Sequence, residues 1–507
     1  MAARVIWQGA IVLVMANLFN RLLSFAYRIL VIRLIGAESM GLYEMVFPFY
    51  SLVLLVATAG VPVALAKMVA ERAARGEWSR VRGVFRLSFW FLTLSGLLFT
   101  AVLYGGAPYL SQRVFADNRV FHAFTAMLFA LPLVCTASAF RGYFQGLQFM
   151  QPLALAQVAE QVVRVTSGLW LALLLLPRGI EWAAAGLAWG MVLGEAVGLL
   201  TNLLIFRLAR PYYELDGGRA PVGGDLLPLL RLAVPVTLAR GASGIMLTLE
   251  ALLIPRQLQA WGASMREATT LYGEYSGIAM TLVYLPMIVT VAVAMVMVPA
   301  MAEAQALKNY TLLHRRCDQA LRITILTGLP FAVVFYFLGA EISKAVFNTP
   351  AAAMPLRALA WGCVFLYLQQ TTNGILNGLG AVKTALFTTL VDGVVDILAV
   401  YFLVPLWGIA GAAWGVNLGC GVSTLLNLAA IARLTGWRPD LGSVVWRPLL
   451  ATAVLGLGLK TAWDVLGLWP GPWQLSGALM GGGVIYLAAL LLTRAVPGRY
   501  LSFWKWI

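Results

Sequence analysis

The sequence predicts an all-α integral membrane protein with 14 transmembrane helices, arranged as two six-helix lobes followed by two additional helices. Composition is the first reason: 61% of the 507 residues are hydrophobic and only 11% are charged, whereas soluble domains are about 25% charged. The second reason is a six-helix pattern that occurs twice along the chain. We expect the two lobes to be related by a pseudo-two-fold axis along the membrane normal.

The spans are apolar runs of about 20 residues or more, separated by glycine, proline and charged residues. Spans two and eight are long enough to tilt or bend. Pro48 and Pro62 are predicted kinks in span two, and Pro286 and Pro299 in span eight. The predicted spans are 8–35, 41–70, 83–104, 120–147, 153–176, 183–207, 228–255, 268–302, 318–339, 356–380, 384–404, 408–432, 446–466 and 473–493.

The loops indicate the orientation of the chain in the membrane. If the N-terminus is inside, the inside loops carry 21 basic residues and the outside loops carry 7. Cytoplasmic loops of membrane proteins are enriched in lysine and arginine. This distribution therefore predicts that both termini are cytoplasmic.

Residues 141–165 align with residues 373–397 at an offset of 232, and they share glycine, amide and acid positions. The motif AGLAWG (185–190) matches AGAAWG (410–415) at an offset of 225. Parallel repeats of this kind are typical of transporters whose central cavity opens to each side in turn. The predicted domains are an N-terminal six-helix lobe (1–210), a cytoplasmic linker (211–227), a C-terminal six-helix lobe (228–435) and two additional helices with a short tail (436–507).

Several functions are excluded by charge and motif content. The net charge of +15 does not indicate a nucleic-acid partner, because the basic residues lie between apolar runs and not on one soluble face. The four cysteines and two histidines lack the spacing of metal ligands. No G-x-x-x-x-G-K-[ST] nucleotide-binding motif occurs. We therefore expect no metal site, no cofactor and no catalytic residues, and a transporter that does not hydrolyse ATP itself.

Three arginines, Arg21, Arg28 and Arg33, interrupt the first span, although an arginine at the bilayer centre costs about 2.5–3.5 kcal/mol. Arg21 and Arg28 share one helix face with Asn17 and Ser24, whereas Arg33 can reach the interface. Guanidinium groups bind phosphate oxygens in a bidentate manner. The pattern predicts a cavity that binds an anionic, phosphate-linked substrate. In the alternative, the arginines pair with acids of neighbouring helices, namely Glu44, Glu160, Glu250, Glu274, Asp392 or Asp396.

Two pairs of charged residues are candidates for ion coupling. Asp392 and Asp396 lie one turn apart on the eleventh span, where like charges repel. This spacing predicts a site for a coupling cation or proton, or pairing with basic residues across the lobes. Glu160 and Arg164 have the same spacing on the fifth span; they are further coupling candidates, although a local ion pair is favoured.

The seventh span adds Arg240 and Glu250 to the candidate substrate site. They are ten residues apart, which places them within about 80° of one another on a helix. Asn373, Asn377 and Gln145 are expected to form hydrogen bonds between helices and not to bind sugar.

Three stretches resemble a known family: N-R-L-L-S-F-A-Y-R-I-L-V-I-R-L-I-G-A (20–37), G-L-Y-E-M-V-F-P-F-Y-S (41–51) and T-A-G-V-P-V-A-L-A-K-M-V-A-E (58–71). The chain resembles the stage V sporulation protein B branch of the polysaccharide-exporter and lipid II flippase division. This division belongs to the multidrug/oligosaccharidyl-lipid/polysaccharide (MOP) exporter superfamily. The resemblance implies the MOP flippase fold, and it assigns the family's cavity arginines to Arg21 and Arg28. One departure is V-F-P-F-Y (46–50) in place of an F-R-x-P-N-like pattern, which implies a less basic pocket.

The resemblance implies a flippase that carries an undecaprenyl-pyrophosphate-linked saccharide, of the lipid II type, to the outer leaflet. Its expected partners are that lipid, the membrane lipids and a coupling cation or proton, and we expect a monomer. The expected location is the bacterial cytoplasmic membrane, or the membrane around the forespore during sporulation. The alternative, a multidrug cation antiporter of the same fold, needs an acidic cavity. A membrane glycosyltransferase needs acidic metal-binding motifs or a large outer loop, and the sequence contains neither.

Overall fold

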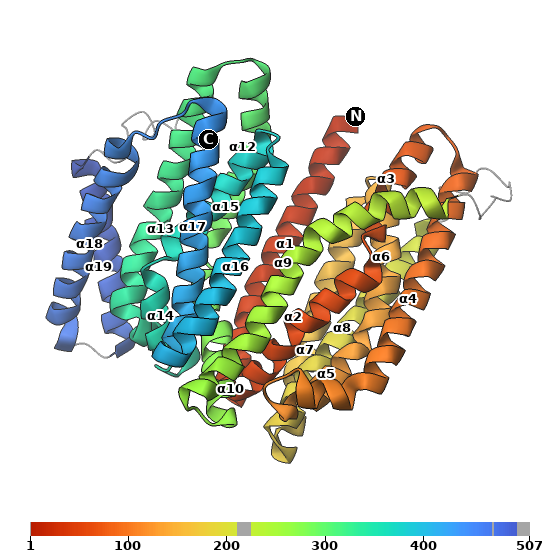
Figure 1. The fold of residues 1–507 in the computed structure, drawn as a ribbon, viewed down its shortest axis with the longest axis horizontal. Coiled ribbons are helices and arrows are strands. Elements are labelled where there is room, and N and C mark those ends of the chain that lie inside the picture. Colours follow the sequence, from red (N-terminus) through yellow and green to blue (C-terminus); the bar gives the residue numbers. More distant parts are fainter. Residues whose placement is uncertain (1, 210–224, 469–470, 494–507) are drawn as a thin grey trace. The chain divides into compact units, whose positions relative to one another are not determined.

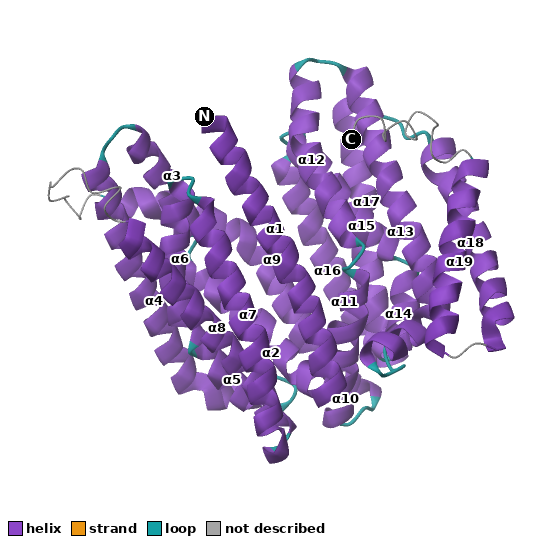
Figure 2. Cartoon of the chain, turned by 180° about the vertical axis from the view of Figure 1, so that it is seen from behind, coloured by secondary structure: helices purple, strands orange, loops and turns teal. Residues whose placement is uncertain are grey.

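The computed structural model describes residues 2–209, 225–468 and 471–493, and almost all of them are helical (Figure 2). No β-strand occurs in these ranges, so the predicted all-α class is confirmed. Most of the predicted linker 211–227 and the tail after residue 493 lie outside the described residues.

Eleven helical segments of the described chain are long and apolar enough to cross a membrane. They correspond to eleven of the 14 predicted spans, so the chain is a multi-pass membrane protein, while the full count of 14 stays a prediction. The other three predicted spans correspond to the charged helices α1 (Ala2–Ile35) and α9 (Leu226–Trp261) and to the broken pair α14 (Ala353–Ala360) and α15 (Cys363–Gly378).

The chain divides into two compact units. Unit 1 comprises Met1–Pro255 and Ser264–Gly273, and unit 2 comprises Arg256–Ala263 and Glu274–Ile507. Most of α9 therefore belongs to unit 1, and the predicted lobe boundaries stay a prediction. Besides α1 and α9, the helices of unit 1 are α2 (Ala37–Thr58), α3 (Val61–Ala74), α4 (Trp78–Arg113), α5 (Phe121–Leu128), α6 (Ala130–Gly146), α7 (Met150–Leu175), α8 (Ile180–Ala209) and α10 (Met265–Gly273).

Unit 2 begins with a π-helical segment, Glu274–Ala279, and contains a second one, Gly442–Trp446. Its last two helices, α18 and α19, pack on each other and on α13 through a separate apolar cluster that includes Leu338, Leu455 and Ala478. Besides α14 and α15, the helices of unit 2 are α11 (Met280–Val283), α12 (Met287–Ala306), α13 (Tyr310–Phe347), α16 (Val382–Trp407), α17 (Ile409–Thr435), α18 (Arg447–Val465) and α19 (Gly471–Leu492).

The second predicted span is broken, but not at its first proline. The helix α2 continues through Pro48 and ends at Ala59 and Gly60, which both have left-handed backbone angles. Pro62 lies in the first turn of α3, where proline lacks only a hydrogen bond that the helix would not make. In the eighth predicted span, the break lies at residues 284–286, as Pro286 predicts, and Pro299 lies inside α12.

Glycines make the same interhelical contact at equivalent positions of the predicted repeats. A Cβ atom on Gly142 of α6 would lie 2.6 Å from the Pro62 carbonyl oxygen at the start of α3. A Cβ atom on Gly374 of α15 would lie 2.7 Å from Ala294 of α12. Both residues of the second contact follow their counterparts by 232 positions, which is the offset that the sequence predicts. The close approach of these helices therefore recurs in both units.

The change of offset from 232 to 225 also has a structural basis. Helix α7 is followed by a 3-10 turn at Leu176–Arg178 and by Gly179, whereas Gly408 alone separates α16 from α17. The longer connection and an earlier start of α8 account for the seven extra residues of the first repeat.

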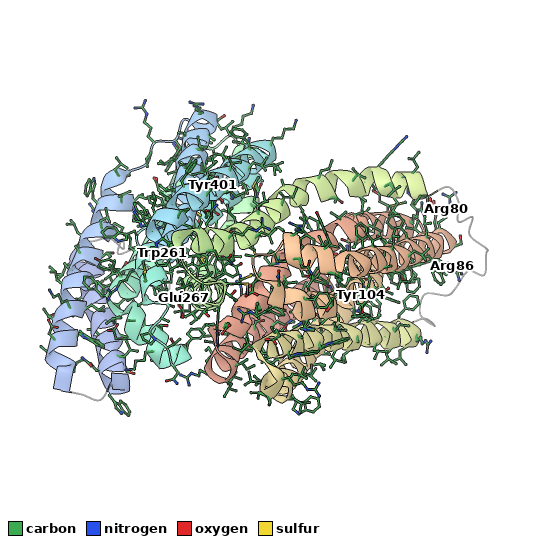
Figure 3. All side chains as sticks on the ribbon, turned by 60° about the horizontal axis from the view of Figure 1, so that its bottom comes forward. Arg80, Arg86, Tyr104, Trp261, Glu267 and Tyr401 are labelled. Carbon is green, nitrogen blue, oxygen red and sulfur yellow. The ribbon has the colours of Figure 1, made fainter. Side chains whose placement is uncertain are left out.

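One end of unit 1 carries arginines of α4. The N-terminal end of α1 and the turn between α3 and α4 lie at one end of this unit, and α5 and α10 lie at the other (Figure 1). Arg80 and Arg86 lie at the first end of α4, and Tyr104 lies farther along the helix (Figure 3). The first end is the one that the loop charges assign to the cytoplasm, and that orientation stays a prediction.

Candidate functional site

Helix α1 carries the arginines of the candidate site into unit 1. Arg21 and Asn17 are exposed, and Arg21 forms no ion pair within the described part of the chain. Ser24 is bound to α7 instead, because its hydroxyl accepts a hydrogen bond of 3.0 Å from the Gln161 amide and donates one to the Asn20 carbonyl. Of the four residues on the predicted face of α1, Asn17 and Arg21 are therefore exposed, and Ser24 forms a hydrogen bond to α7.

Arg28 forms an ion pair with Glu44 of α2, with 2.6 Å between its Nη2 atom and the carboxylate Oε1 atom. The alternative expectation, that an arginine of the first helix pairs with an acid of a neighbouring helix, therefore holds for Arg28. Tyr272 of α10 lies within electrostatic range of Arg28, Glu44 and Glu250. Arg28 and Glu250 thus both lie around Tyr272, and their membership of one substrate site stays a prediction.

Arg240 lies on the exposed surface of α9, and within the described residues it has no ion-pair partner. Glu250 is half-buried. Helix α9 is continuous between the two residues, and their common place in the substrate site stays a prediction.

Glu160 and Arg164 of α7 form the predicted local ion pair, at 2.6 Å. It is part of a larger network that the sequence did not predict. Arg164 also contacts Glu195 of α8 at 2.6 Å, and Arg141 of α6 contacts Glu160 at 2.8 Å. Two arginines and two glutamates therefore balance one another between α6, α7 and α8, and we name these residues the buried quartet.

A glycine pattern on α8 allows this network to form. Gly190 packs on Gly168 of α7, and Gly194 packs on the Glu160 carbonyl. The missed members, Arg141 and Glu195, were detectable from the sequence as charged residues within apolar runs, and Glu195 directly follows Gly194. Their pairing was not, because it depends on which faces of three helices meet.

The equivalent positions of unit 2 carry different charges. Asp392 and Asp396 of α16 pack against Gly419 and Gly415 of α17. The Cys420 thiol, next to Gly419 in the chain, donates a hydrogen bond of 3.5 Å to the Gln369 side-chain oxygen. At the repeat offsets of 232 and 225, the quartet members Arg141, Glu160, Arg164 and Glu195 correspond to Asn373, Asp392, Asp396 and Cys420.

The buried quartet is neutral, whereas its counterpart in unit 2 contains two acids and no arginine. This difference favours Asp392 and Asp396 over Glu160 and Arg164 as candidates for ion coupling. Within the described residues, no cluster of three or more histidine, cysteine, aspartate or glutamate side chains could hold a metal ion.

A second charged cluster lies at the opposite end of unit 1 from the α3–α4 turn. Glu38, at the start of α2, pairs with Arg119 at 2.6 Å and with Arg266 of α10 at 3.0 Å. Arg119 also pairs with Asp117 at 2.7 Å, and the Thr269 hydroxyl donates a hydrogen bond to that aspartate. Arg119 and Arg266 are two of the seven basic residues in the predicted outside loops. We name this set the α2–α10 cluster.

Unit 2 contains an apolar cavity of about 980 Å³. It lies between α13, α15, α17 and α18, and Lys460 is the only charged residue that lines it. Aromatic and aliphatic side chains, including Tyr336, Trp361 and Trp437, form most of its wall. Such a wall suits an alkyl or prenyl chain.

Comparison with protein families adds to this description. A family model described as "Polysaccharide biosynthesis protein" matches residues 6–305, more than half of the chain. The chain belongs to this family. A second model, described as "MatE", matches residues 272–402. The family and the fold are those of the MOP superfamily, with a likeness to polysaccharide and lipid II flippases.

The chain is similar to two proteins of Bacillus subtilis, among others. It is 29% identical to "Stage V sporulation protein B" over 443 residues, which cover 86% of this chain and 85% of that protein. It is 24% identical to "Lipid II flippase MurJ" over 499 residues, which cover 91% of this chain and 89% of that protein.

Two solved structures share its fold. A "Lipid II flippase MurJ, inward closed conformation" covers 96% of this chain and 99% of its own, with a TM-score of 0.69 and 14% identity. An inward-facing multidrug resistance MATE family transporter of the MOP superfamily covers 82% of this chain and 95% of its own, with a TM-score of 0.67 and 16% identity. Together with the family match, these likenesses confirm the predicted resemblance to polysaccharide and lipid II flippases, and the two solved structures show that the chain has the fold of MOP transporters.

Proposed function

We propose that this protein is a flippase for an undecaprenyl-pyrophosphate-linked saccharide. The substrate moves from the cytoplasmic to the outer leaflet by alternating access. The observation that carries the proposal is the pair of guanidinium groups on one face of α1, of which Arg21 is exposed and has no ion-pair partner within the described residues. A membrane protein retains such charges where they bind a substrate or another charge.

The chemistry of pyrophosphate fits these arginines. A pyrophosphate diester carries about two negative charges, and guanidinium groups stay protonated and form bidentate hydrogen bonds with phosphate oxygens. Asn17 lies beside Arg21 on the exposed stripe, while Arg240 and Glu250 lie on α9. In this proposal these residues contact the head group, and Ser24 positions α1 through its hydrogen bond with Gln161.

The lipid tail needs an apolar environment. The bilayer offers one. The likeness to a lipid II flippase and to a stage V sporulation protein supports a peptidoglycan precursor of the lipid II type, destined for the spore cortex. The location proposed is the cytoplasmic membrane or the membrane around the forespore, with both termini in the cytoplasm.

We assign energy coupling to Asp392 and Asp396. These acids lie one turn apart and lack an arginine at the position that Arg164 takes in the buried quartet. Two carboxylates one turn apart repel each other, and a bound cation or proton would reduce that repulsion. Glu160 and Arg164 already balance each other, so they are assigned a structural role in this proposal.

A multidrug cation antiporter is the second candidate, because the MatE model matches residues 272–402 and a multidrug transporter shares the fold. Its substrate is a lipophilic cation, which the arginines of α1 would repel. Purified protein in vesicles separates the two functions: it is offered either a fluorescent lipid II analogue or a lipophilic cation.

The proposal predicts flipping of the lipid analogue, without ATP, and a strong loss of that activity in Arg21→Ala and Arg28→Ala. Arg33→Ala is the matched control, because Arg33 lies at the end of α1. Uptake of the cation without flipping of the lipid would favour the antiporter. Equal flipping by all three variants would refute the role of the arginines.

A further inference from the structure

Glu44 contacts Arg28 of the candidate site, although an acid there opposes the binding of an anion. Its side chain is 11% exposed, and the Arg28 side chain that it contacts is 31% exposed. The two groups are 2.6 Å apart, the distance of a strong charge-assisted hydrogen bond. Glu44 Oε1 makes no hydrogen bond of standard geometry, but the acid neutralises the charge on Arg28 that a phosphate group would bind.

We infer that Glu44 is a positioning residue that forms an ion pair with Arg28 when no substrate is bound. In the empty protein, its carboxylate neutralises and orients the guanidinium; in the loaded protein, the pyrophosphate displaces it. The inference rests on the proposed function and adds a residue to it. Carboxylate and phosphate oxygens compete for the same hydrogen-bond donors of an arginine.

An empty flippase has a physical need for such a group. To return for the next substrate, it must move its binding site across the membrane without the anion. An unpaired guanidinium inside the membrane is unfavourable, and a partner of opposite charge removes most of that penalty. Glu44 supplies this charge from a neighbouring helix, so it can move away when the anion arrives.

Helix α2 also provides a matched control. Glu38 lies six residues before Glu44 on the same helix, and its carboxylate pairs with Arg119 and Arg266, not with α1. Both glutamates are about nine-tenths buried and ion-paired. Neutralising Glu38 removes a similar charge from the same helix but leaves Arg28 with its partner.

The test measures two quantities on purified protein: the Kd for inorganic pyrophosphate, by calorimetry, and KM and kcat for flipping of a fluorescent lipid II analogue in vesicles. We expect Glu44→Gln to bind pyrophosphate about tenfold more tightly, because the competing charge is gone. We expect its KM and its kcat both to fall, because the empty site now carries an uncompensated arginine. Glu38→Gln should leave the Kd for pyrophosphate unchanged.

Glu44→Asp is a second variant that keeps the test decisive if Glu44→Gln does not fold. It keeps the charge but withdraws the carboxylate by one methylene, so its Kd should lie between the values of the parent and Glu44→Gln. A Kd that is unchanged or weaker in both Glu44 variants, while Arg28→Ala abolishes binding, would overturn the inference and leave the proposed function intact. If Arg28→Ala binds pyrophosphate as tightly as the parent, the proposed function itself fails.

Discussion

Gly41 of α2 and Gly273 of α10 form a reciprocal contact between two helices of unit 1. A methyl group on Gly41 would overlap the Thr269 carbonyl oxygen, and one on Gly273 would overlap the Ala37 carbonyl oxygen. Each residue of α10 in this contact follows its counterpart of α2 by 232 positions. Equivalent helices of the two repeats thus cross at equivalent glycines, beside the α2–α10 cluster of ion pairs.

This crossing predicts a large effect of a small substitution. Gly41→Ala should lower the free energy of unfolding by about 1–3 kcal/mol, because the methyl group meets backbone atoms that cannot rotate away. Thermal unfolding of the purified protein in detergent measures the change. Gly105→Ala on α4 is the control, because no heavy atom lies within 4 Å of its added Cβ. Equal melting temperatures of the two variants would show that α2 and α10 can move apart at little cost in free energy.

The orientation of unit 1 can be tested with single cysteines at the two ends of α4. Ala74, just before this helix, and Tyr109, near its end, are both exposed. In intact cells, an impermeant thiol reagent should label Tyr109→Cys but not Ala74→Cys. The parent protein gives the background, and its four cysteines are buried. Labelling of Ala74→Cys in unbroken cells would reverse the orientation.

The two acid sites should respond to neutralisation in different ways. Glu160→Gln leaves two half-buried arginines with Glu195 as their one remaining acid, so it should destabilise the protein by roughly 1–3 kcal/mol. Asp392→Asn should leave the melting temperature nearly unchanged and should reduce transport and its response to an ion gradient. Melting and vesicle transport are measured on the same preparations. A stable Glu160→Gln variant with impaired coupling would move the coupling site to unit 1.

A lysine at position 28 separates charge from geometry. Arg28→Lys keeps a positive charge beside Glu44 but loses the fork that binds two phosphate oxygens. We expect it to insert and accumulate normally and to restore only part of the growth of a flippase-deficient strain, with Arg28→Ala restoring less. The loss of one charge-assisted contact, about 1.5–3 kcal/mol, corresponds to roughly ten- to a hundredfold in affinity. Full activity of Arg28→Lys would mean that charge alone suffices.

Much of the fold could be predicted because it depends on local properties of the chain. The apolar runs predicted eleven of the helical segments that can span a membrane, and the repeat predicted that α3–α6 and α12–α15 pack alike. The sequence predicts kinks of the second span at Pro48 and Pro62, whereas the helix breaks at Ala59 and Gly60. Proline at the start of a helix marks a boundary, but a left-handed glycine produces it.

The sequence by itself determined the class of the protein, its family and the face of α1 that carries Arg21 and Arg28, because composition and helical periodicity are properties of one segment. Only the tertiary structure decided which charges meet. Arg28 pairs with Glu44, and Arg141 contacts Glu195, 54 residues further along the chain. An ion pair within a membrane protein is selected by the packing of helices that are distant in sequence, since the bilayer offers an unpaired charge no solvent.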